Sequence, residues 1–160
     1  HSQLYDELEE LEAAYQSYLQ AGSPASFSTC LVTQTFSPTV SSPKVIYFTT
    51  TLYAPSKYQE ACTAFYKDTG ELVDMEDLFT CTQEELGQVL LDEAGITDPT
   101  LRQEMEDAFA PDRLILSSDL LRVQYEAGSL PSQDVTYSLS FDYDDTILER
   151  MHAWAVPDSQ

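Results

Sequence analysis

The stretch 64–79 constrains the fold of this chain most strongly, because it joins a strand, a tight turn, a second strand and the start of a helix. The turn chemistry lies at 67–70, where Gly70 is free to adopt a positive φ that other residues rarely take. So short a turn brings the chain back beside itself, which predicts an antiparallel hairpin. The helical turn that follows should bury Leu78 and Phe79. We interpret the stretch as a structural corner and not as a chemical site.

Strand-forming and helix-forming residues are grouped in separate blocks along the chain. The pattern predicts a helix over 3–20, a β-meander over 27–73, a helical pair over 82–109, C-terminal strands over 113–148 and a tail at 149–160. Such blocks are typical of α+β proteins, and short connections favour antiparallel neighbours. We therefore predict a single domain over 1–160, with an α+β fold in which an antiparallel β-sheet has the helices packed on one face.

Local signals refine the boundaries of the meander. Strands are expected near 27–36, 44–53 and 60–66 because Thr, Val, Ile, Phe and Tyr are frequent there. Pro- and Ser-rich groups at 37–38 and 41–43 mark a hairpin loop between the first two strands.

Both central helices have start signals. Thr82 and Glu85 have the spacing of a capping box, and Asp98 precedes Pro99 as an N-cap precedes a proline at the first helical position. These signals predict two short helices inside the block.

Two apolar patterns are interpreted as core faces. The first helix has a stripe that recurs every three or four residues, made of Leu4, Leu8, Leu11, Tyr15, Tyr18 and Leu19. The last block has a strand that alternates with polar residues, through Val135, Tyr137, Leu139 and Phe141. We expect both sets to be buried.

The charge of the chain restricts its partners. Twenty-eight acidic and seven basic residues give a formal net charge of −21, which argues against nucleic acid and anionic membrane surfaces. A macromolecular partner should be cationic, although an acidic surface also serves solubility alone. We see no apolar run long enough for membrane insertion. The chain begins at His1 without Met, so we expect a processed or truncated product, from which an upstream signal or anchor could have been removed.

The three cysteines, Cys30, Cys62 and Cys81, have no C-x-x-C spacing. Their odd number and spacing predict neither a zinc ribbon nor a disulfide framework. A bridge between Cys30 and Cys62 and a pair of buried free thiols both remain open.

An acidic run follows the apolar strand near the C-terminus. Asp142, Asp144 and Thr146 fit the D-x-D-x-T signature of haloacid-dehalogenase phosphatases, and Asp145 completes the D-x-D-D of protonating terpene cyclases. The first chemistry needs a downstream Ser/Thr, a Lys and further acids on a parallel sheet, and the second needs a much longer helical barrel. We therefore interpret 142–145 as an acidic turn, and keep a metal-dependent hydrolase using this cluster as the alternative.

Other candidate sites are less specific. Acidic clusters at Asp68/Glu71 and 74–77 could bind Ca²⁺ only if their loops converged with 142–145, and none has EF-hand spacing. His1 is terminal, and nothing near His152 suggests a triad. We predict no catalytic residue, no metal site and no cofactor.

One stretch resembles a known family. The pattern F-x-K-D-T-G-E-L-x-x-x-E-D-L-F, with weaker support from 120–126, is similar to the uncharacterised (DUF) domain in the extracytoplasmic part of RsiV-type anti-sigma factors and beside some peptidoglycan deacetylases. The match is made by Phe65, Asp68, Thr69, Gly70, Leu72, Asp77, Leu78 and Phe79. The resemblance covers roughly 5–148. It implies the same α+β fold and, for the sensor members, lysozyme binding.

The function expected from these observations is a non-enzymatic binding or sensor module of the bacterial cell envelope. The resemblance implies an extracytoplasmic location, secreted or anchored at the cell surface. The charge favours a basic protein such as lysozyme as the partner, with cell-wall material as the other ligand considered.

Overall fold

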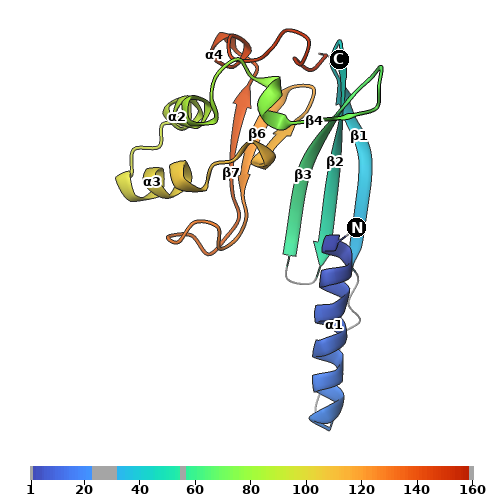
Figure 1. Ribbon diagram of the computed structural model, residues 1–160. Coiled ribbons are helices and arrows are strands. Elements are labelled where there is room, and N and C mark those ends of the chain that lie inside the picture. The colour runs from blue at the N-terminus through green and yellow to red at the C-terminus, as the bar shows by residue number, and fades with distance from the viewer. Residues whose placement is uncertain (1, 23–31, 55–56, 159–160) are drawn as a thin grey trace.

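The computed structural model describes residues 2–22, 32–54 and 57–158 and has an α+β fold with antiparallel strands, as predicted (Figure 1). The helices are α1 (Ser2–Gln20), α2 (Gln83–Glu93), α3 (Pro99–Ala108) and α4 (Asp145–Leu148). The strands are β1 (Thr33–Ser41), β2 (Val45–Ala54), β3 (Lys57–Tyr66), β4 (Leu72–Val73), β5 (Leu114–Leu116), β6 (Leu120–Tyr125) and β7 (Tyr137–Asp142). Two 3-10 turns, η1 (Met75–Leu78) and η2 (Pro111–Arg113), precede α2 and β5.

The strands form two sheets, and the prediction of one sheet was wrong. One sheet has the order β1-β2-β3-β4 and the other the order β5-β6-β7. The division follows from β4, which is only two residues long and is succeeded at once by η1 and the two helices. The later strands therefore pair only with one another among the described residues. A shared apolar core still joins the sheets, since Tyr47, Leu90, Met105 and Leu121 belong to one buried cluster.

Helix α1 does not bury its apolar stripe, which corrects the expectation that this stripe is core. Leu8 is 46% exposed, Tyr15 and Leu19 are also exposed, and Leu11 and Tyr18 are only half-buried. Figure 1 shows α1 extending beyond the end of the β1-β2-β3 sheet. The periodicity of a sequence specifies a helix and its apolar face, but it does not supply a surface for that face to cover.

Strand β1 lies later in the chain than the sequence indicated. It covers Thr33–Ser41 instead of 27–36, and the residues 27–31 lie outside the described part of the chain. Pro38 is therefore inside a strand and not in a loop. The ladder to β2 shifts its register between Pro38 and Val40, and β1 is an edge strand. An edge with a bulge is where a strand tolerates a residue that lacks an N–H.

The corner at 64–79 has the predicted structure. Gly70 has a φ of +71°, and the Tyr66 N–H donates to the Glu71 carbonyl at 2.9 Å to close the β3–β4 hairpin. Leu78 is 0% exposed and Phe79 is also buried. The turn of the corner is thus fixed by backbone geometry, and its last residues, Leu78 and Phe79, are anchored in the core.

The start signals of both central helices are confirmed. Thr82 and Glu85 make the two reciprocal hydrogen bonds of a capping box at α2. The Asp98 carboxylate accepts from the N–H groups of Thr100 and Leu101 at 2.9 and 2.8 Å, with Pro99 at the start of α3. The polar alternation of the last strand also holds over β7, although Val135 lies before the strand and is exposed.

The tail after α4 is part of the folded structure and ties distant segments together. The His152 N–H donates to the Leu78 carbonyl at 2.9 Å. The buried Ser42 hydroxyl, in the β1–β2 turn, donates to the Trp154 carbonyl at 2.9 Å, and the Tyr47 hydroxyl donates to the Ala155 carbonyl. The C-terminal segment therefore joins the corner to the β1–β2 turn.

Candidate functional site

The acidic run at 142–145 has a structural role. Asp142 ends β7, and the Asp144 carboxylate accepts from the Ile147 N–H at 3.0 Å as the N-cap of α4. Both sheets are antiparallel, whereas the phosphatase motif needs a parallel sheet. Within 2–22, 32–54 and 57–158, no group of three or more His, Cys, Asp or Glu side chains could hold a metal ion. The run fits the acidic turn that we predicted.

The remaining candidate residues are also explained by the fold. The ring of His152 stacks on that of Trp154, with centroids 5.5 Å apart. Cys62 is a buried free thiol whose pKa is raised by burial, and Cys81 is a partly buried free thiol. Cys30 lies outside the described residues, and so does the proposed pairing with Cys62.

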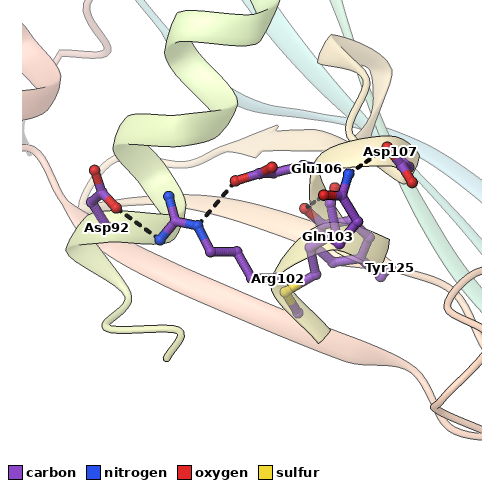
Figure 2. A network of polar contacts seen from close by, with 7 residues as sticks. Asp92, Arg102, Gln103, Glu106, Asp107 and Tyr125 are labelled. Carbon is purple, nitrogen blue, oxygen red and sulfur yellow. Dashed lines mark hydrogen bonds and ion pairs between the residues drawn. The ribbon is translucent and has the colours of Figure 1, made fainter. Parts of the chain in front are cut away.

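The four arginines all bond within the molecule. Arg102 of α3 pairs with Asp92 of α2 at 2.8 Å and with Glu106 of its own helix at 3.0 Å, as Figure 2 shows. The other three contact Glu60, the Ala108 carbonyl and the Thr146 carbonyl: Arg122 at 3.0 Å, Arg113 at 2.7 Å and Arg150 at 2.6 Å. The arginine charges are therefore used within the fold, and 28 acidic residues against seven basic ones leave an excess of carboxylates without counter-charges.

Tyr125 belongs to the same structural scaffold. Its hydroxyl donates to the Met105 carbonyl at 3.3 Å, and the guanidinium of Arg113 lies over its ring at 5.7 Å. Burial raises the pKa of Tyr125 to about 12, so the hydroxyl stays protonated and remains a donor at neutral pH. Arg113 is thereby held between α3 and β6 by its contacts with the Ala108 carbonyl and the Tyr125 ring.

Strand β3 is covered on its outer edge over only part of its length. Strand β4 pairs with Ala64 and Phe65 alone. Because the Tyr66 N–H points to this edge, the backbone groups of every second residue back along the strand, at Cys62, Glu60 and Tyr58, point there as well. No backbone hydrogen bond joins those three residues to another segment on this side within the described chain. This half of β3 is an open edge.

A cavity of about 360 Å³ lies along this open edge, and we call it the β3 groove. It is lined by residues 59–63 of β3 and by Asp112, Arg113, Gln124 and Glu126 from η2 and from β6 with its following residue. A second cavity of about 590 Å³ shares Cys62, Thr63 and Asp112 with the β3 groove and continues along β4 and η1. The two together follow β3 from its open half to the corner.

Two side-chain contacts cross from β3 to the second sheet beside the groove. The Glu60 carboxylate pairs with Arg122 of β6 at 3.0 Å, and the Gln59 Nε2 donates to the Glu126 carboxylate. Residues 122, 124 and 126 alternate along the strand direction, so one face of β6 is turned toward β3.

The groove contains two amide atoms that have no hydrogen-bond partner. Gln124 is 5% exposed and its buried Nε2 bonds to nothing within the described residues. The buried Oε1 of Gln59 is also without a partner there. Buried polar groups are nearly always satisfied, and an unsatisfied one lowers the free energy of unfolding. Two in one groove therefore mark the most chemically unusual place in the described structure.

This site was not predicted from the sequence. Arg122, Gln124 and Glu126 alternate with apolar residues, which is the ordinary pattern of a strand with one solvent-exposed face. The structure turns that polar face toward β3 instead. A glutamine between an arginine and a glutamate is the only signal, and it does not distinguish a buried polar face from an exposed one.

Comparison with known proteins found no matching family model and no matching curated protein. The resemblance to the domain of RsiV-type anti-sigma factors therefore depends on the sequence pattern of the corner, with weaker support from 120–126. Within the described residues, none of the helices combines the length and the apolar character that crossing a membrane would require.

Proposed function

We propose that this chain is a non-enzymatic binding or sensor module of the bacterial cell envelope, and that its ligand is a basic protein. The observation that supports the proposal is the distribution of charge. The formal net charge is −21, and the arginines are all engaged in contacts within the molecule. The free surface charge is consequently acidic, which favours a cationic partner in orientation and in association rate.

The contacts of the potentially reactive side chains support binding over catalysis. Asp144 caps a helix, His152 stacks on Trp154 and Cys62 is buried as a protonated thiol, so each has a structural use. The β3 groove offers amides, carboxylates and an open strand edge, which are groups that bind peptides. The extracytoplasmic location and the sensor role come from the resemblance and are part of the proposal.

Isothermal titration calorimetry with lysozyme tests the proposal, because lysozyme is basic and the resemblance implies it. We expect binding at low ionic strength that weakens at moderate salt, since exposed charges are screened over about 10 Å at 0.1 M salt. Succinylation of the lysines of lysozyme leaves the polypeptide chain the same but reverses much of its charge, so succinylated lysozyme should not bind. An absence of heat with native lysozyme at both salt concentrations would contradict the proposed ligand.

A further inference from the structure

We propose that the β3 groove binds an extended peptide segment of the basic partner as an added strand, with Gln124 and Gln59 bonding to its peptide groups. This inference depends on the proposed function for the identity of the partner. It assigns the site and the chemistry that is recognised there, which the charge of the molecule alone does not.

The open half of β3 supplies the first part of the argument. Backbone N–H and C=O groups at Glu60 and Cys62 point away from β2 on an edge that β4 does not reach. An extended peptide placed along this edge would continue the antiparallel ladder, as β4 does further along the same strand. Strand addition of this kind obtains its affinity from main-chain hydrogen bonds.

The two unpaired amide atoms supply the second part. The Gln124 Nε2 is a donor that needs an acceptor, and the Gln59 Oε1 is an acceptor that needs a donor. A peptide group carries one of each. A peptide in the groove can therefore pair with the strand edge and, once the two buried amides turn toward it, bond to both side chains. Because Gln124 is 5% exposed, its unbonded amide destabilises the free protein and would be relieved by a ligand in the groove.

The charges around the groove select the kind of peptide. Glu60, Asp112 and Glu126 line it, and Asp74, Glu76 and Asp77 line the adjoining cavity. The guanidinium groups nearby, Arg113 and Arg122, are already held by the Ala108 carbonyl and by Glu60. Glu60 and Glu126 are likewise engaged, by Arg122 and by Gln59. The side chains of a bound strand would therefore meet the carboxylates of Asp112 and of the adjoining cavity, which favours lysine and arginine at alternate positions.

The test uses the whole chain and a blocked pentapeptide of alternating lysine and valine, followed by NMR of the glutamine side-chain amides. We expect the resonances of Gln124 and Gln59 to shift on titration. A second pentapeptide with N-methyl groups on alternate peptide nitrogens has the same charge but lacks the donors, and it should shift them far less.

Two variants separate recognition from folding. Gln124→Met removes the unbonded amide, so we expect the melting temperature to stay the same or rise while affinity for the pentapeptide falls about fivefold, the value of one lost hydrogen bond. Gln59→Met should weaken binding in the same way. Gln103→Met is the matched control, because Gln103 lies exposed on α3 and bonds only to Asp107.

Three results of the peptide and sugar titrations would overturn the inference. The first is a pentapeptide that leaves both glutamine resonances unchanged, and the second is equal binding of the N-methylated peptide. The third is a shift of these resonances by N-acetylglucosamine with none by the peptide, which would assign the groove to a sugar. If native lysozyme binds equally to the wild type and to Gln124→Met, the groove assignment fails while the proposed function stands. If the peptide binds in the groove and lysozyme does not bind, the groove assignment stands while the proposed ligand fails.

Discussion

Strand β3 is closed at one end and open at the other. Its last residues pair with β2 on one side and with β4 on the other, and Ala64 is fully buried. Its earlier residues pair with β2 alone and face a groove that contains two unbonded amide atoms. In one half of β3, the outer backbone groups pair with β4. In the other half, no strand of the described chain pairs with them.

The difference between the halves separates architecture from recognition. The closed half is held by a turn, a hairpin and the buried side chain of Leu78, so changes there should alter stability. The open half keeps unsatisfied polar groups that lower stability, so changes there should alter binding. Substitutions in the closed half should therefore act mainly on stability, and substitutions in the open half mainly on binding.

The largest effect is expected at Leu78 in the closed half. Leu78→Ala should lower the free energy of unfolding by about 2–5 kcal/mol, because the side chain is fully buried and leaves a cavity. Urea denaturation measures the change. Leu72→Ala is the matched control, since Leu72 is 60% exposed and its loss should change stability by less than about 0.5 kcal/mol. Similar losses for both leucines would show that the corner is not anchored in the core.

A smaller loss is expected at Gly70. Gly70→Ala should cost roughly 1 kcal/mol or more, because the φ of +71° strains any residue with a Cβ. No atom lies within 4 Å of the added Cβ, so the cost comes from the backbone and not from a clash. Gly70→Asn should recover part of it, since asparagine tolerates this conformation better. Thermal melts that do not distinguish glycine, alanine and asparagine would contradict the turn geometry.

The smallest effect on stability is expected in the open half, at Glu60. Glu60→Gln removes the charge from the contact with Arg122 but keeps a hydrogen-bond acceptor there. Because the Glu60 side chain is 13% exposed and that of Arg122 is 32% exposed, we expect a cost of about 1 kcal/mol. The same change removes a carboxylate from the β3 groove and should weaken binding of a basic partner at low salt more than at high salt. A large loss of stability with unchanged binding would assign Glu60 to architecture and weaken the comparison.

The elements that were predicted correctly have signals that are local in sequence. The turn at Gly70, the capping box at Thr82 and Glu85, and the N-cap at Asp98 each depend on residues within one turn of each other. Such geometry is specified by backbone conformation and short hydrogen bonds, which sequence spacing describes well.

The features that were missed depend on which surfaces meet. The stripe of α1 has the periodicity of a core helix, yet Leu8 is exposed, because no periodicity identifies a packing partner. Pro38 appeared to end β1, but an edge position and a register shift accommodate it. The β3 groove forms because the polar face of β6 turns toward β3, a long-range arrangement that neither strand specifies by itself.

The most direct test compares the two halves of β3 in one binding experiment. Lysozyme is titrated calorimetrically into the wild type, Gly70→Ala and Gln124→Met at the same low salt concentration, and each variant is also melted. We predict that Gly70→Ala melts lower and binds as the wild type does, while Gln124→Met melts no lower and binds more weakly. If Gly70→Ala instead lost binding without a change in melting, and Gln124→Met bound normally, the corner would be the recognition surface and the assigned roles would be reversed.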